Sequence, residues 1–239
     1  MRFSLLDHGF MFLQGASLFC LNYLLFYICE LTLISGVVAL IFSTIVVMNM
    51  LNGILFLKNR FELRMGVGAC LGLIGIVLVF WPEIIDFENG SENLMAAALA
   101  VLATFLASVG NIVSVRNQRH GIPVIEANTY GMTYGALIML ALSLVTGQQF
   151  SFEMTASYIG SLIFLTVFAT IIAFLSYLTL LGRVGVERGA YASLIFPLVA
   201  LGISTIVEGY QWSAYAGIGI ALILTGNLLI LKQRNRGII

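Results

Sequence analysis

The placement of charged residues constrains the fold of this chain more than any other feature. Eight stretches of at least 18 residues contain no Asp, Glu, Lys or Arg. Each is long enough to cross a bilayer as a helix, which needs about 20 apolar residues. Only helices and closed barrels satisfy their backbone polar groups in hydrocarbon, and the short alternating segments of barrel strands are absent. The sequence therefore predicts an all-α polytopic membrane protein with eight transmembrane helices, over 9–29, 31–57, 65–82, 93–115, 127–152, 154–182, 189–207 and 209–231.

The composition agrees with this prediction and excludes several classes of protein. Of the 239 residues, 60% are hydrophobic and only 9% are charged, whereas about a quarter are charged in typical soluble domains. This balance excludes disorder and argues against water-soluble enzymes and nucleic-acid-binding proteins. The first stretch lacks a basic region and a small-residue cleavage site, so we do not interpret it as a signal peptide. We expect the lipid bilayer and a small-molecule solute as partners, with no nucleic acid and no cofactor.

The loop charges predict how the chain is oriented. If the N-terminus is cytoplasmic, the inner segments carry all 11 basic residues and the outer loops carry none. The outer loops contain only acidic charges, such as Glu30, Glu92 and Glu208. Cytoplasmic loops of membrane proteins carry an excess of Lys and Arg. The sequence therefore predicts a multi-pass protein of the cell (inner) membrane with both termini in the cytoplasm.

An internal repeat relates the two parts of the chain. Residues 34–61 align with 183–210 at an offset of 149, so that Gly36 meets Gly185 and Thr44 meets Ser193. The loop at 58–64 is basic and inner, whereas its counterpart at 208–212 is acidic and outer. The two copies are therefore predicted to be inverted, as in many transporters.

The helix count indicates that the first copy is incomplete. Five predicted helices follow Leu94 in 146 residues, and only three precede it in 93. If the repeat unit has five helices, the first copy lacks its first two. We expect residues 1–93 to form an incomplete first repeat of three helices and residues 94–239 to form a second repeat of five, an incomplete inverted repeat (3 + 5).

The last two predicted helices resemble a known family. The segment "GRVGVERGAYASLIFPLVALGISTIVEGYQWSAYAGIGIALILTGNLLIL" combines small residues, Pro197 in mid-helix, Glu208 at a helix end and regularly spaced glycines. It is similar to the closing helix pair of the EamA-type drug/metabolite transporter family. The resemblance implies ten helices in two inverted five-helix repeats, with both termini cytoplasmic. It also implies secondary transport or export of small metabolites through a central cavity between the repeats.

The chain departs from the family pattern in three ways. The first two of the ten helices are absent, and one of them normally helps to wall the cavity. Met48 stands where the first repeat usually has proline, and Asn59 replaces the usual Glu before Arg60. A fragment, a mis-called start and a degenerate paralogue all remain open as explanations.

Several predicted helices carry neutral polar or aromatic residues at helical spacing. Thr104, Ser108 and Asn111, for example, fall at i, i+4 and i+7. Polar side chains at membrane depth need partners or water, so they either line a solute route or join helices to one another. The candidates for the cavity lining are Asn22, Tyr23, Asn49, Asn52, Thr104, Ser108, Asn111, Tyr130, Tyr134, Thr170, Tyr177, Tyr191 and Pro197.

Two further features have a structural and a functional interpretation. Pro197 should kink its helix, either around a cavity or as a packed kink. Gly68, Gly72 and Gly75, with Gly217 and Ala221, form faces of small residues. Such faces are typical of close packing between membrane helices, which is the interpretation we adopt.

The chemistry of the spans favours transport of uncharged or zwitterionic solutes. No carboxylate, histidine or basic residue lies well inside a span, so the buried ionisable group of a proton relay is missing. The sequence contains no HExxH or GxSxG motif, and its three cysteines lack metal-ligand spacing, so we assign no catalytic or metal-binding residue. We therefore expect a secondary transporter or exporter of small metabolites (amino acids, nucleotide-like or drug-like solutes) that works by alternating access. The alternative is a truncated, non-transporting membrane paralogue that needs a partner chain, and a homodimer is a further arrangement to consider.

Overall fold

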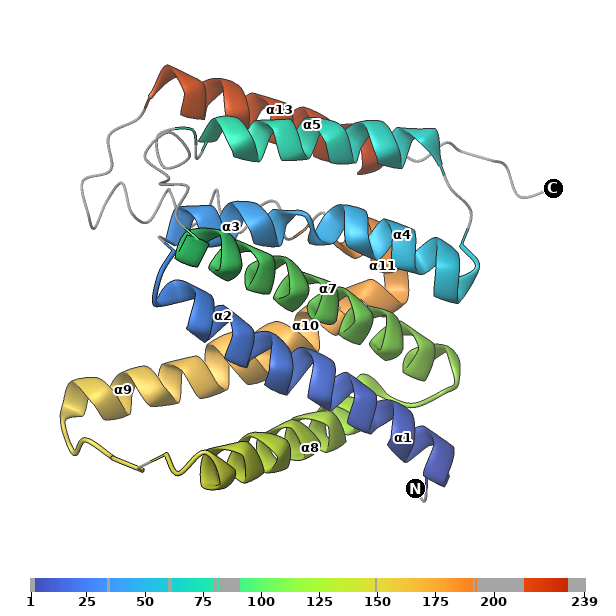
Figure 1. The fold of residues 1–239 in the computed structure, drawn as a ribbon. Helices are drawn as coiled ribbons and strands as arrows, with labels where there is room; N and C mark the ends of the chain where they lie inside the picture. The colour runs from blue at the N-terminus through green and yellow to red at the C-terminus, as the bar shows by residue number, and fades with distance from the viewer. Residues whose placement is uncertain are drawn as a thin grey trace.

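The computed structural model describes residues 3–33, 35–59, 62–79, 81, 91–148, 150–190, 192 and 213–231. Over these residues the chain is helical and contains no strand (Figure 1). The prediction of an all-α membrane protein is thus confirmed. The elements are α1 (Leu5–Gln14), η1 (Gly15–Leu21), α2 (Asn22–Glu30), α3 (Ser35–Ser43), α4 (Ile45–Leu57), α5 (Leu63–Val79), α7 (Ser91–Arg119), α8 (Val124–Val145), α9 (Ala156–Phe164), η2 (Leu165–Ile172), α10 (Ala173–Val184), α11 (Val186–Ala190) and α13 (Ala214–Leu231).

Within the described residues, five continuous helical segments are long and apolar enough to cross a membrane, and two shorter apolar helices, α5 and α13, accompany them. These seven segments match seven of the eight charge-free stretches, with ends that differ by several residues. Some stretches extend past a helix end because loops near a membrane also contain uncharged residues, and some helices, such as Leu5–Glu30 and Glu92–Arg119, extend past the stretch because their terminal turns carry charged residues. The remaining stretch, 189–207, lies almost entirely outside the described residues.

Helix α7 is the centre of the bundle. It packs against α1, η1 and α2 on one side, α3 and α4 on another, and α10 on a third. Small residues on α7, including Ala100, Ala103 and Ala107, are fully or almost fully buried and let the neighbouring helices approach closely. Figure 1 shows α1–α2 running alongside α7, with α3–α4 above them. The polar residues of α7 are therefore enclosed by several helices at once.

Glycines determine the close crossing of η1 and α8. A Cβ atom placed on Gly15 would collide with the Gly131 carbonyl, and one placed on Gly135 would lie 3.0 Å from the Gly15 carbonyl oxygen. Both obstacles are backbone atoms, which cannot rotate away. These positions therefore require glycine for packing.

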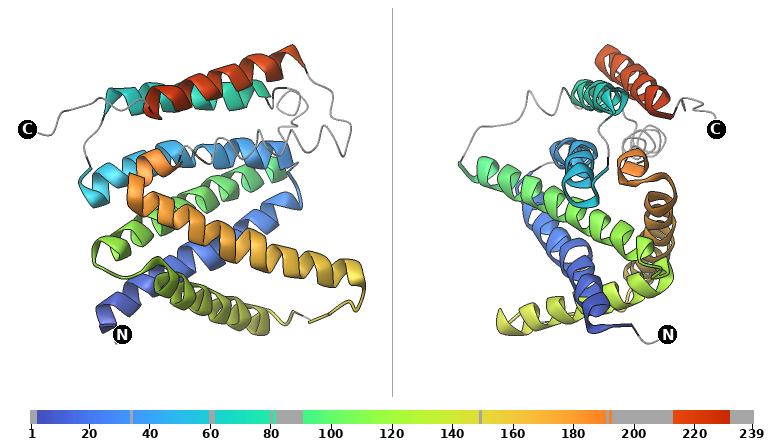
Figure 2. Two further views of the ribbon diagram at one scale, coloured as in Figure 1. Left: turned by 180° about the vertical axis from the view of Figure 1, so that it is seen from behind. Right: turned by 90° about the vertical axis from the view of Figure 1, so that its right-hand side faces the viewer.

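Helices α5 and α13 form a separate pair along one side of the molecule (Figure 2). A Cβ atom on Gly75 would lie 2.5 Å from the Gly219 carbonyl oxygen, and one on Gly226 would lie 2.7 Å from the Gly68 carbonyl oxygen. The residues of the last helix that pack closely are Gly219 and Gly226, whereas the predicted contact residues of that helix, Gly217 and Ala221, are exposed, so that part of the prediction is wrong. Nothing lies within 4 Å of the Cβ position of Gly217.

Three of the spans depart from regular α-helix. The first span contains the π-helical segment η1, and the sixth contains the π-helical segment η2. The second span breaks between α3 and α4 at Thr44, whose backbone N–H and hydroxyl both donate to the Ile41 carbonyl, at 3.1 and 2.7 Å. This span contains no proline, so local hydrogen bonding by Thr44 accompanies the break.

Candidate solute-binding site

Five of the candidate polar residues meet where α4, α7 and α10 adjoin. Asn49 and Asn52 come from α4, Ser108 and Asn111 from α7, and Tyr177 from α10. We call this set the amide cluster. Asn49 and Ser108 are completely buried, and Asn111 is 1% exposed. The helical spacing of these residues in the sequence directs them to shared faces, and α7 brings the faces together.

Hydrogen bonds connect the three helices through the amide cluster. Asn52 Nδ2 donates to Ser108 Oγ at 2.8 Å. Asn111 Nδ2 donates to Asn49 Oδ1 at 3.5 Å and to the Tyr177 hydroxyl at 3.3 Å. The two bonds of Asn111 are longer than the usual range for N–H···O bonds, about 2.7–3.2 Å, so they are weak.

In the part of the chain that the structure describes, two buried atoms of the amide cluster have no hydrogen-bond partner. They are Nδ2 of Asn49, a donor, and Oδ1 of Asn111, an acceptor. An unpaired buried polar group costs about 1–3 kcal/mol. The pair therefore offers one donor and one acceptor that a polar solute could satisfy.

An aromatic layer adjoins the amide cluster on the side of α2 and η2. Phe174, three residues before Tyr177 on α10, packs edge-on against Phe19 with ring centroids 5.1 Å apart. Tyr23 of α2 also packs against Phe174, at 6.3 Å, and its hydroxyl lies next to Thr170. Tyr23, Thr170 and Tyr177 therefore belong to one neighbourhood.

Two other candidates bond to the backbone. Asn22 Nδ2 donates to the Ala103 carbonyl of α7 at 2.9 Å, and it joins two helices. Thr104 is completely buried, and its hydroxyl donates to the Ala100 carbonyl one turn earlier at 2.8 Å. The hydrogen bonds of these two side chains therefore go to backbone carbonyls and not to members of the amide cluster.

Tyr130 and Tyr134 lie apart from the amide cluster, at the end of the bundle where α1 begins. The Tyr134 hydroxyl lies 2.8 Å from His8 Nδ1. The Tyr130 ring packs edge-on against His8 at 5.0 Å, and Phe3 packs on both. These aromatics close the contact between α1 and α8.

A buried amide network at the same end was not among the sequence candidates. Gln14 Nε2 donates to Asn128 Oδ1 at 2.9 Å, and Asn117 Nδ2 donates to Gln14 Oε1 at 3.1 Å. The network joins α1, α7 and α8, and Gln14 and Asn117 are completely buried. A polar residue that stands alone in an apolar helix has no second polar residue at helical spacing in its own segment, so helical periodicity does not reveal it.

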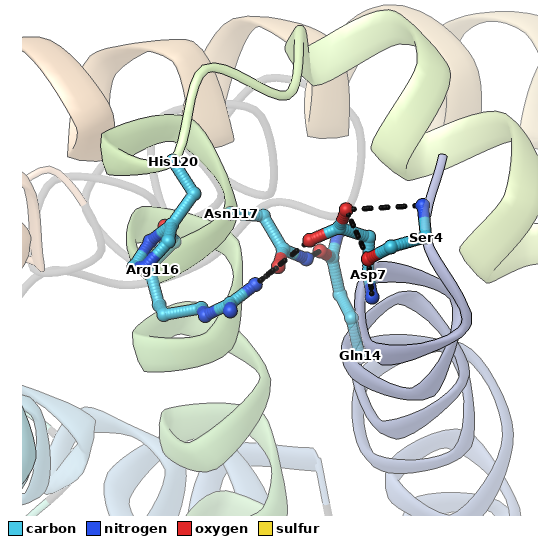
Figure 3. A network of polar contacts seen from close by, with 6 residues as sticks. All are labelled: Ser4, Asp7, Gln14, Arg116, Asn117 and His120. Carbon is cyan, nitrogen blue, oxygen red and sulfur yellow. Dashed lines mark hydrogen bonds and ion pairs between the residues drawn. The ribbon is translucent and has the colours of Figure 1, made fainter. Parts of the chain in front are cut away.

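Charged residues extend this network toward solvent (Figure 3). Asn117 Oδ1 accepts from Arg116 Nη1 at 3.2 Å, and the same Nη1 lies 3.6 Å from Asp7 Oδ1. Asp7 and Ser4 form a capping box that begins α1. The His120 ring lies 2.9 Å from the Arg116 carbonyl oxygen. The basic charge near this network thus lies at the end of the bundle where α1 begins and α7 ends.

The remaining candidates, Tyr191 and Pro197, lie outside the described residues. Among the described residues, no group of three His, Cys, Asp or Glu side chains could hold a metal ion. The chemistry that the described residues offer is therefore neutral hydrogen bonding beside aromatic rings.

Comparison with known proteins identifies the family. The EamA-like transporter family matches residues 94–232, more than half of the chain. The chain belongs to the EamA-like transporter family. This membership agrees with the resemblance of the last two predicted helices to the family. The chain is therefore a member of a family of membrane transporters.

Individual relatives of this EamA-family chain are distant. An "Uncharacterized transporter" of Clostridium kluyveri is 23% identical over 193 residues, covering 80% of this chain and 61% of the relative. Protein PagO of Salmonella typhimurium is 23% identical over 221 residues, covering 91% and 70%. A "Probable amino-acid metabolite efflux pump" of Salmonella typhimurium is 23% identical over 207 residues, covering 80% and 66%. The chain thus spans about three fifths to seven tenths of the length of these relatives.

A solved crystal structure shares the fold. It superposes with a TM-score of 0.79 at 17% identity, covering 92% of this chain and 75% of the other. At this identity the similarity concerns the fold alone.

Proposed function

We propose that this chain moves small neutral or zwitterionic metabolites across the cell membrane by alternating access, and that it catalyses no chemical reaction. The amide cluster is the observation that carries the proposal. It lies at the junction of α4 with α7 and α10, is buried at membrane depth, and has one donor and one acceptor unpaired. Sites at the interface between transporter repeats bind substrate near the membrane midplane.

The chemistry of the cluster supports the proposed substrate class. Its described members are amides, a hydroxyl and a phenol, with no fixed charge to balance an ionic solute. Phe19, Phe174 and Tyr23 supply an aromatic wall beside them. A zwitterionic amino acid offers acceptors and donors together, and one relative is named a probable amino-acid metabolite efflux pump.

The proposed mechanism requires two repeats, with boundaries at 1–93 and 94–239. Two observations support them. The family match begins at residue 94. Shifting the π-helical segment Gly15–Leu21 by the repeat offset of 149 places it on 164–170, which overlaps η2, Leu165–Ile172. The same irregularity at equivalent positions is expected of copies with a common architecture.

The loop charges support the proposed orientation, with both termini on the cytoplasmic side of the cell (inner) membrane. Three loops that carry basic residues contact one another at one end of the bundle. Arg119 donates to the Leu57 carbonyl and to Asn59, and Arg188 lies 3.9 Å from Glu62. Basic loops of membrane proteins lie preferentially on the cytoplasmic side.

Solute counterflow into liposomes tests the transport proposal. The purified chain is reconstituted and assayed with a panel of radiolabelled neutral, zwitterionic and charged metabolites, beside a ten-helix family member. We expect saturable uptake of at least one uncharged or zwitterionic solute, and at least about a fivefold loss in Asn111→Ala, because each lost hydrogen bond to a solute costs about 1 kcal/mol or more. Thr133→Ala is the control, since its hydroxyl bonds only within its own helix. Uptake by the relative alone would overturn the proposal.

A second candidate is a non-transporting subunit that pairs with another chain or with itself. One observation favours it. The span from Ala156 to Val184 has no buried residue in its most apolar window, whereas the corresponding window of Leu5–Glu30 is 44% buried. Affinity purification from the native membrane would distinguish the candidates, because an obligate partner would remain bound in stoichiometric amount.

A further inference from the structure

A lateral groove lies between α1, α4 and α7, separate from the amide cluster. Its volume is about 400 Å³, and seven of its eight lining residues are apolar. Phe10 and Leu13 come from α1, Phe56 and Leu57 from α4, and Ile112 from α7. The volume is that of a small-molecule site, although almost nothing in its wall could orient a polar solute.

The rim of the groove faces the hydrocarbon. Leu13 is 42% exposed and Phe56 is 61% exposed, and both belong to membrane-spanning helices. Exposed apolar side chains on such helices contact lipid. The groove is therefore accessible from within the bilayer, and its natural occupant is an apolar chain.

One charged residue, Arg116, lines the groove. Its guanidinium carbon lies 3.7 Å from the centroid of the Phe10 ring, a cation–π contact. Its contacts with Asp7 and Asn117 both use Nη1. Nη2 and Nε thus keep N–H donors that these contacts do not use, and planar guanidinium donors suit phosphate oxygens.

More positive charge surrounds this end of the groove. Arg119 donates to the carbonyl of Leu57, which lines the groove, and Lys58 is the next residue. Three cations therefore lie near the one carboxylate, Asp7, that Arg116 contacts. Basic pockets between helices on the cytoplasmic side of membrane proteins recognise anionic lipid headgroups.

We propose that this groove binds an anionic phospholipid, with one acyl chain between α1, α4 and α7 and the phosphate held by Arg116. Arg119 and Lys58 add attraction from the rim. The apolar wall accounts for the chain, and the charge excess accounts for the preference for an anionic headgroup. The site is independent of the solute route.

Native mass spectrometry of the full chain, purified in detergent, tests the proposal. It is titrated with palmitoyl-oleoyl phosphatidylglycerol or with phosphatidylcholine bearing the same acyl chains. We expect one phosphatidylglycerol molecule to bind more tightly than phosphatidylcholine. Arg116→Gln should weaken phosphatidylglycerol binding about fivefold, the effect of one basic residue near an anionic lipid, and should weaken phosphatidylcholine binding less, because the choline cation offsets the charge of the phosphate that the two lipids share. Arg188→Gln removes a basic residue at the same end, outside the groove lining, and should change neither.

A second variant separates the acyl chain from the headgroup. Val109→Phe fills the groove and keeps Arg116, so it should weaken the binding of both lipids. Glycerol 3-phosphate, an anionic phosphate without acyl chains, should not compete. Equal affinity for the two lipids would overturn the proposal, as would unchanged lipid binding by Val109→Phe. Competition by glycerol 3-phosphate would mean that Arg116 forms a simple anion site.

Discussion

At the scale of single residues, Asn49 and Asn111 are the described members of the amide cluster with the greatest free-energy cost of burying unpaired polar atoms. Both are buried, a 3.5 Å bond joins them, and each keeps one polar atom unpaired. A pair kept only for helix packing would be expected to satisfy its atoms, since most buried polar groups do so. The cost is consistent with a site that exchanges these bonds for bonds to a solute.

Leucine substitutions separate the structural from the functional contribution of this pair. Asn111→Leu leaves both polar atoms of Asn49 without a partner, so it should lower the free energy of unfolding by about 1–3 kcal/mol. Asn49→Leu/Asn111→Leu removes both buried amides and should recover most of that loss. Thermal unfolding in detergent measures stability, and liposome counterflow measures transport. Transport should remain absent in the double variant. Recovery of transport together with stability would show that the pair only joins helices.

The polar residues also show what sequence patterns can predict. Spacing within a helix identified Asn49, Asn52, Ser108 and Asn111, because their shared face follows from helical geometry. Spacing did not distinguish Asn22 from the members of the amide cluster. Asn22 donates to the Ala103 carbonyl, and that partner depends on which helix packs opposite. Gln14 was missed for the same reason, as its partners lie 103 and 114 residues away in the sequence.

At the scale of elements, the crossing of η1 and α8 depends on the absence of a side chain at Gly15. Gly15→Val would drive its side chain into the backbone of Gly131. Overpacking of this kind costs about 1–3 kcal/mol or more, so the unfolding temperature in detergent should fall. Gly160→Val is the matched control, because Gly160 is also a helical glycine and nothing lies within 4 Å of its Cβ position. If the two variants were equally stable, the close crossing would not exist in the membrane.

Element boundaries illustrate a second limit of the sequence. The runs without charge located the helices, since apolar length is what a bilayer selects. They did not indicate η1 or η2, because the choice between i→i+4 and i→i+5 bonding is a local response to packing. Nor did they indicate the break at Thr44 in a span without proline.

At the scale of the whole molecule, the buried amide network and the aromatic contacts close the basic end of the bundle. Gln14 joins α1, in the proposed first repeat, to α7 and α8, in the proposed second. His8 and Tyr134 add a contact between the same two parts. Alternating access requires these parts to separate at this end during part of the cycle. We call the conformation in which this end is shut the closed form. Hydrogen bonds that exist only in the closed form stabilise it by an amount equal to their own free energy.

Breaking one such bond should therefore shift the population of the open form. Gln14→Leu removes about 1–2 kcal/mol of polar interaction from the closed form, which corresponds to an increase of about 5–30-fold in the open fraction. The readout is the rate at which a cytoplasmic-side thiol reagent labels Ser108→Cys in a chain whose Cys20, Cys29 and Cys70 are replaced by alanine. Gln118→Leu is the matched control, since Gln118 donates to the Leu178 carbonyl at 2.9 Å and both residues belong to the proposed second repeat. Faster labelling only in Gln14→Leu is expected if the repeats move as bodies, whereas equal labelling in both variants would mean that the two parts do not separate there.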